Sequence, residues 1–171
     1  LDQLIAAPKQ KISYTKTASR TSVAAMPFSV FDLAGSPAAG TLAVGNTTTG
    51  IVPTDTLAGY PIINTFAGGT TGYLSGVHFA STVASRITIF DCLFSAGAFA
   101  FNAAVTLSSQ PSYAARVPSG TDFKGTEIWL EAVTAFTGNQ SIAVTYTNQD
   151  GVAGRTTGTI ATGVAPIVGR M

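Results

Sequence analysis

Few residues in this 171-residue chain have side chains suited to catalysis. His78 is its single histidine and Cys92 its single cysteine, and no Gly-x-Ser-x-Gly motif presents a serine. We interpret His78 as a half-buried strand residue between Val77 and Phe79. Cys92 lies in an apolar run, residues 87–94, which predicts a buried, inert thiol in preference to a nucleophile.

The carboxylates do not form a recognisable acid–base pair. Glu127 and Glu131 share one face of a predicted strand, where four residues span about 13 Å, whereas glycosidases need carboxylates about 5 to 9.5 Å apart. Asp91, in apolar surroundings, either has a raised pKa or pairs with Arg86 or a backbone amide. We therefore expect no enzymatic activity, no metal site and no cofactor.

The charge content points to an assembled protein. Only 10% of the residues are charged and the net charge is +1, whereas soluble globular proteins average about 25% charged residues. Such a surface favours packing against neighbouring subunits, so we expect an oligomer or an assembly subunit. The near-zero net charge gives no reason to expect binding to nucleic acid or to a membrane.

The positive charges gather near the N-terminus. Residues 1–20 contain four of the nine basic residues, opposed only by Asp2. Two interpretations are open, a solvated flexible arm and an arm that docks on an acidic partner surface. The second makes five residues of this arm candidates for partner binding: Lys9, Lys11, Tyr14, Lys16 and Arg20.

The chain reads as an all-β protein. Short β-branched and aromatic runs alternate with Gly, Pro, Asn and Asp clusters, which favours an antiparallel β-sandwich or a jelly-roll-like barrel. We expect an N-terminal arm over residues 1–20, one sandwich domain over 21–160 and a tail over 161–171. Residues 21–56 should be loops with brief strands. The expected strands are residues 11–16, 60–66, 73–80, 86–94, 99–107, 127–134, 141–148 and 152–160.

The clearest local prediction is a hairpin near the C-terminus. Ile142, Val144 and Tyr146 alternate with small polar residues, and residues 148–151 (NQDG) have turn chemistry. The chain should then return through residues 155–157, with one face of the hairpin in the core. Trp129, the only tryptophan, fits either a core position or an interface anchor.

Three stretches resemble small virion proteins of tailed phages: residues 86–91 (RITIFD), 125–131 (GTEIWLE) and 144–156 (VTYTNQDGVAGRT). The similarity covers somewhat under half of the chain. It implies a capsid-associated β-sandwich or jelly roll that is present in many copies and performs no covalent chemistry.

The resemblance implies a capsid decoration, or cement, protein of a bacteriophage head. Such a structural protein, made in the host cytoplasm, would sit on the outer surface of the head and bind the major capsid protein and copies of itself. A homotrimer would match local three-fold positions of the lattice. By binding only the expanded lattice, it would stabilise the head by mass action.

Three other roles remain open. A carbohydrate-binding or receptor-binding module of a fibre would use exposed aromatic residues, for which Tyr60, Tyr73, Tyr113 and Trp129 are the candidates. A tail-tube subunit would insert a long loop into the next ring, and residues 21–56 could serve. A head–tail joining subunit is the remaining alternative.

Overall fold

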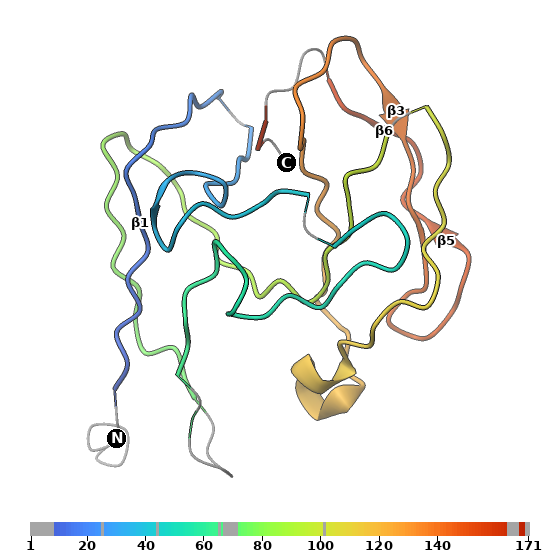
Figure 1. Ribbon diagram of the computed structural model, residues 1–171. Helices are drawn as coiled ribbons and strands as arrows, with labels where there is room; N and C mark the ends of the chain where they lie inside the picture. Colours follow the sequence, from blue (N-terminus) through green and yellow to red (C-terminus); the bar gives the residue numbers. More distant parts are fainter. Residues whose placement is uncertain are drawn as a thin grey trace.

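The fold was analysed in a computed structural model, which describes residues 9–24, 26–43, 45–64, 66, 72–100, 102–163 and 168–169. These residues form six two-residue strands: β1 (Thr15–Lys16), β2 (Gly35–Ser36), β3 (Ser141–Ile142), β4 (Thr145–Tyr146), β5 (Arg155–Thr156) and β6 (Ile160–Ala161). Two short 3-10 helices, η1 (Ala114–Arg116) and η2 (Pro118–Gly120), separate the two groups of strands. Most of the described chain runs between these elements without regular structure (Figure 1).

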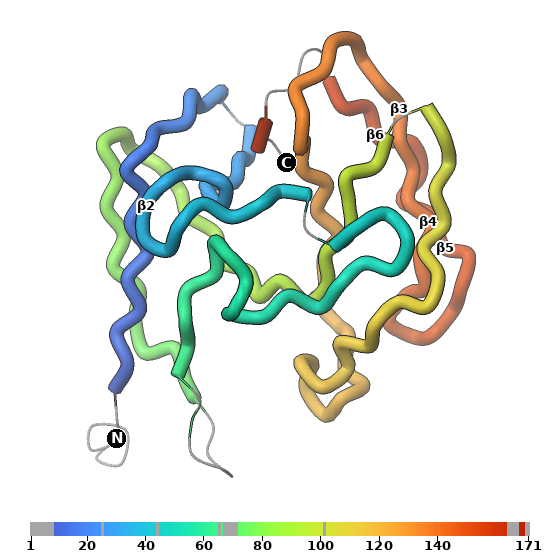
Figure 2. Tube along the Cα trace, viewed as in Figure 1, coloured from blue at the N-terminus to red at the C-terminus, as the bar shows by residue number. Residues whose placement is uncertain are grey.

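The strands pair into three separate two-stranded antiparallel sheets, β1–β2, β3–β6 and β4–β5. Figure 2 shows β2 on the left of the molecule and β3 to β6 on the right. The three sheets do not join into a closed barrel or sandwich in the described part of the chain. The all-β sandwich therefore stays a prediction.

The first sheet depends on a close approach of two backbones. Thr15 pairs with Ser36 and Lys16 with Gly35. A Cβ atom built on Gly35 would lie 2.1 Å from the carbonyl oxygen of Thr15, so only glycine fits at this position. The sheet joins the start of the chain to a loop twenty residues further on.

The predicted C-terminal hairpin is confirmed. Ser141 pairs with Ala161, Ile142 with Ile160, Thr145 with Thr156 and Tyr146 with Arg155. The expected face is only partly covered, because Ile142 and Val144 are half-buried and Tyr146 is exposed.

Asn148 closes the turn of this hairpin. Its side-chain oxygen accepts hydrogen bonds from the backbone N–H groups of Asp150 (3.1 Å) and Val152 (2.9 Å). Its carbonyl accepts from Gly151 (3.0 Å), which has a φ of +77°. Such a φ is readily adopted by glycine and rarely by other residues. The Asn and Gly that predicted the turn are therefore the residues that make it.

The described residues of 21–56 form loops with brief pairing, as expected. A turn at Asn46 is closed by its side-chain oxygen, which accepts from the backbone N–H groups of Thr48 and Thr49, both at 2.8 Å. Ile51 forms an isolated antiparallel bridge with Ser95. These bonds fix residues 45–52 against the middle of the chain.

Several expected strands are not formed as paired strands. Within the described residues of 60–66, 73–80, 86–94, 99–107 and 127–134, the chain forms no sheet ladder. Alternating β-branched and aromatic residues favour an extended backbone, but a strand also requires a neighbouring edge to pair with. The described chain supplies no such edge at these positions.

Burial is correspondingly low. Among the described residues, Val117 is the only Val, Leu, Ile, Met or aromatic residue that is buried, at 8% exposure. The chain has an accessible surface of 12484 Å², whereas a folded monomer of 17.4 kDa exposes about 7,900 Å². A single copy therefore leaves much of its apolar surface in contact with water.

The hairpin turn gives a direct test. Asn148→Ala removes two side-chain hydrogen bonds and should lower the free energy of unfolding by about 1 kcal/mol. Gln149→Ala, at the next position, removes only a contact with Asp150 and serves as the control. Urea unfolding at one fixed protein concentration measures both. Equal midpoints for the two variants would contradict the role assigned to Asn148.

Candidate functional site

The five candidate partner-binding residues fall into two groups. Tyr14, Lys16 and Arg20 lie where the N-terminal segment is attached to the rest of the chain, through the β1–β2 pairing and a hydrogen bond from Thr17 N–H to the carbonyl of Ala34 (2.9 Å). Lys9 and Lys11 precede this attachment and are exposed. The structure therefore separates positions held within the chain from positions open to a partner.

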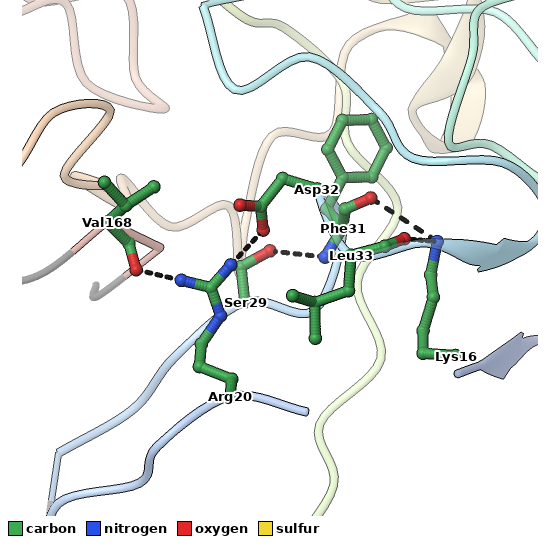
Figure 3. A network of polar contacts seen from close by, with 7 residues as sticks. All are labelled: Lys16, Arg20, Ser29, Phe31, Asp32, Leu33 and Val168. Carbon is green, nitrogen blue, oxygen red and sulfur yellow. Dashed lines mark hydrogen bonds and ion pairs between the residues drawn. The ribbon is translucent and has the colours of Figure 1, made fainter. Parts of the chain in front are cut away.

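Lys16 fastens the loop that follows it. Its ammonium donates to the carbonyl oxygens of Leu33 (2.9 Å), Pro37 (3.0 Å) and Phe31 (3.5 Å). Figure 3 shows the contacts with Leu33 and Phe31. An ammonium has three donors, so this environment uses its full capacity. Burial lowers the pKa of Lys16, and the nearby carboxylate of Asp32 partly opposes that shift.

Tyr14 lies beside this ammonium. The Lys16 nitrogen is 4.7 Å from the centre of the Tyr14 ring, within the range of a cation–π contact. Burial, followed by the charge of Asp32, raises the pKa of the Tyr14 hydroxyl. Tyr14 still exposes 43% of its surface, so it is the one residue of the attached group that a partner can reach.

Arg20 joins three distant parts of the chain. Its guanidinium forms an ion pair with Asp32 and also donates to the carbonyl of Val168 (Figure 3). The side chains of Arg20 and Asp32 are only 8% and 21% exposed. Close by, Ser29 N–H donates to Gly169 (2.7 Å) and Gly169 N–H to Ala132 (2.8 Å). These contacts, named here the clasp, hold residues 20, 29, 32, 132, 168 and 169 together. Arg20 is therefore not available to bind a partner.

Glu131 lies in the same cluster with its charge poorly satisfied. Burial raises the pKa of its carboxyl above the ordinary value of 4.5; a hydrogen bond with Ser29 lowers it, Asp32 raises it and Arg20 lowers it, in decreasing order of effect. Its Oε1 atom and the Nε atom of Arg20 are buried without a hydrogen-bond partner. Burial therefore favours the protonated form of Glu131 more in the folded chain than in the unfolded chain.

Lys9 and Lys11 flank a residue that fixes the open part of the segment. The Gln10 side chain donates to the carbonyl of Ile62 (3.2 Å) and accepts from the backbone N–H of Asn64 (3.1 Å). These two bonds hold the backbone between the lysines against residues 62–64. Both lysines are exposed there.

An open groove of about 530 Å³ begins beside Lys11. Its walls are residues 11–13, 36–38 and 55–62. Apolar side chains such as Ile12, Leu57 and Ile62 line it, while Lys11 and Asp55 supply the charges. Apolar walls with one cation and one anion suit a polypeptide segment, so Lys9, Lys11, Tyr14 and this groove form the candidate partner-binding site.

A second polar cluster corrects the expectations for Asp91 and Cys92. Asp91 is not buried: its side chain is 61% exposed, and it pairs with Arg116 in place of Arg86. Arg116 also donates to the carbonyls of Pro53 (2.8 Å) and Cys92 (3.0 Å). Cys92 is half-buried, and its sulfur contacts the carbonyl of Phe94 at 3.6 Å.

Tyr60 adjoins this second cluster. Burial raises the pKa of its hydroxyl, and a hydrogen bond with Cys92 adds to the shift. The Tyr60 hydroxyl is therefore protonated near neutral pH, and the hydrogen bonds of this cluster hold residues 53, 60, 92 and 116 together. The hydrogen bonds of Tyr60, Cys92 and Arg116 therefore have a structural role.

The expectation that His78 is half-buried was wrong, because His78 is exposed in an open stretch of chain.

Two of the four aromatic candidates for carbohydrate binding, Tyr60 and Tyr113, pack against other aromatic rings. Tyr60 packs on Phe31 (4.9 Å between ring centres), and Tyr113 packs on Phe94 (6.2 Å) and on Phe123 (5.8 Å). These contacts stabilise the chain by packing Tyr60 and Tyr113 against other aromatic rings.

Trp129 lies at the surface of the single chain. It exposes 42% of its area, packs on Phe90 (4.9 Å) and donates from its indole N–H to Glu127 (3.0 Å). It does not occupy a core position in this chain. Its role as an interface anchor stays a prediction.

Over the described residues, no three His, Cys, Asp or Glu side chains gather as metal ligands would. Within the same residues, no helix has the length and apolar character to cross a membrane.

No protein-family model, curated protein sequence or solved structure matches the chain. The similarity to tailed-phage virion proteins stays a prediction from three sequence stretches, and the functional argument depends on the geometry described above.

Sequence reasoning missed the partners of its own candidates. Asp32 pairs with Arg20, and Arg116 pairs with Asp91. Glu131 lies close enough to Arg20 for the charge of Arg20 to lower the pKa of its carboxyl. The pairs lie twelve or more positions apart with no shared element, so no periodic spacing signals them. The one available signal is that a weakly charged chain retains few carboxylates without a specific partner.

The clasp predicts an unequal effect of two charge removals. Arg20→Gln leaves Asp32 partly buried and unpaired and should lower the free energy of unfolding by about 3 kcal/mol. Lys9→Gln removes an exposed charge and should change it by less than about 0.5 kcal/mol. Chemical denaturation measures both. A small, equal effect of the two substitutions would refute the structural role of Arg20.

Glu131 predicts a pH dependence of stability. Since its pKa is higher in the folded than in the unfolded chain, its contribution is fully present below pH 4.5 and is lost as the pH rises through the folded-state value. Glu131→Gln should flatten this decline and unfold at a higher temperature than the natural chain at pH 7. Glu127→Gln, which changes an exposed carboxylate, is the control. Parallel pH profiles for all three proteins would exclude the assignment.

Proposed function

We propose that this chain is a non-enzymatic structural subunit of a tailed-phage particle that binds the outer surface of the expanded head as a decoration protein. One observation carries the proposal: the chain exposes far more total surface than a folded monomer of its mass, leaves many large apolar side chains exposed, and carries very little charge. A subunit built in this way gains its stability from neighbours. The resemblance of residues 86–91, 125–131 and 144–156 to small virion proteins supports the same class.

The partners in this proposal are the major capsid protein and further copies of the chain, assembled as a homotrimer. Lys9 and Lys11 would contact acidic groups on the capsid surface, and the adjacent groove would receive a capsid segment. Tyr14 can add an aromatic contact at the same place. Lys16 and Arg20 take an indirect part by fixing the segment that presents these residues.

Binding that favours the expanded lattice explains how such a subunit would act. Each copy that binds only the expanded form stabilises it by mass action. No covalent step is required. The exposed lysines would add a salt-dependent attraction that speeds the encounter more than it tightens the complex.

The test is a comparison of two head forms. The purified protein is mixed with expanded, undecorated heads and with unexpanded heads, and bound protein is measured by cosedimentation and located by cryo-electron microscopy. The proposal predicts saturable binding to expanded heads and ordered density over the lattice. Density confined to the portal vertex or the tail would contradict it in favour of a joining or tail subunit.

A charge reversal tests the docking residues. The double variant Lys9→Glu, Lys11→Glu should weaken binding to expanded heads at least tenfold in low salt and leave the melting temperature unchanged, because both side chains are exposed. Lys124→Glu reverses another exposed lysine at a distant position and is the matched control. Equal binding by the two variants would show that the N-terminal lysines do not dock.

A further inference from the structure

The longest open stretch of the described chain is residues 72–91, named here the apolar segment. All twenty residues are exposed. Eight of them carry large apolar side chains: Tyr73, Leu74, Val77, Phe79, Val83, Ile87, Ile89 and Phe90. Exposure of this extent over one continuous segment is typical of an interaction surface.

The backbone of the apolar segment pairs with no other segment of the described chain. No backbone–backbone hydrogen bond involves residues 72–91 there, and the one backbone N–H among them with an acceptor is that of Val83, which donates to the Ser81 hydroxyl (3.3 Å). The polar contacts within the segment are local hydroxyl bonds, such as those of Ser81 and Ser85 with the carbonyl of Val83 (2.6 and 2.9 Å). An unpaired extended backbone with apolar side chains is the surface to which a further β-strand adds.

The size of the open surface indicates what covers it. The chain exposes 12484 Å², which is about 4,600 Å² more than a folded monomer of this mass and far above the ~800 Å² per partner of a standard interface. The eight side chains of the apolar segment alone contribute roughly 800 Å². Areas of this order are buried in obligate assemblies, whose subunits fold together.

The composition of the segment selects the partner. Arg86 and Asp91 are its only charged residues, and Asp91 is already paired with Arg116. A highly charged partner surface therefore finds little to match. The fitting partner is an uncharged extended chain with apolar side chains, which every other copy of this protein supplies in equal number.

From these observations we infer that residues 72–91 form a β-strand pairing surface between copies of this chain, and that the free protein is an obligate homo-oligomer held together by it. This inference rests on the self-association in the proposed function and names the segment responsible. Because an apolar area of this size must be covered before any head is met, its partner is another copy and not the capsid. The expected strands within 73–80 and 86–94 would then form between chains.

Hydrogen exchange on the purified, full-length protein tests the pairing without any head present. The inference predicts that backbone amides across residues 73–90 exchange at least a hundredfold more slowly than unprotected amides, although the single chain gives a hydrogen-bond acceptor only to the amide of Val83, from the Ser81 hydroxyl. Fast exchange across the whole segment would overturn it.

Two valine substitutions test the interface. Val77 and Val152 are similarly exposed in the single chain, at 50% and 44%, but only Val77 lies in the apolar segment. By native mass spectrometry, Val77→Asp should raise the dissociation constant of the oligomer at least tenfold, whereas Val152→Asp should leave the natural stoichiometry. Equal oligomers for both variants, or a monomeric natural protein, would overturn the inference.

The two proposals can fail separately. An oligomer with slow exchange at residues 73–90 that ignores expanded heads would support this inference and refute the head-binding function. A monomer that binds expanded heads would do the reverse.

Discussion

An extended polypeptide carries one N–H donor and one C=O acceptor per residue, and both need partners once its apolar side chains leave water. This constraint governs the molecule. Residues 72–91 present eight large apolar side chains on a backbone that pairs with no other segment of the described chain. Among all the described residues, Val117 is the only large apolar residue that is buried. The contacts that a single copy does form are confined to three places: the β1–β2 pairing at Gly35, the hairpin closed at Asn148 and the clasp around Arg20. These elements fix the positions from which the open segments project.

The clasp links the same constraint to function. Arg20 and its neighbours bring residues 20–32, 131–132 and 168–169 together, so the N-terminal segment is anchored at residues 15–20, and the exposed Lys9 and Lys11 lie before that point. Lys11 then lines a groove, and Lys9 lies two residues before it in the sequence. The clasp also buries the carboxyl group of Glu131, and this burial raises its pKa. In the proposed function, anchoring and docking therefore belong to different members of this basic group of residues.

The sequence predicted what depends on neighbouring residues and not what depends on distant ones. The hairpin at residues 141–161 followed from alternation and from an Asn–Gly turn pattern, both of which act within a few residues. The loop character of residues 21–56 followed from Gly and Pro in the same way. By contrast, Asp91 pairs with Arg116 and not with the nearby Arg86, and His78 is exposed, because these outcomes depend on which distant segments meet. Alternation over residues 73–94 predicted strands, and it does not specify whether the pairing edge belongs to the same chain or to another copy.

The central claim is that this chain completes its fold with other copies of itself. Sedimentation equilibrium and circular dichroism, recorded on the same dilution series of the full-length protein, test that claim most directly. The account predicts a closed oligomer at high concentration and, on dilution, dissociation and loss of secondary structure over the same concentration range, because folding and association are linked. A monomer that keeps its circular dichroism spectrum and its melting temperature at the lowest concentration would contradict the account.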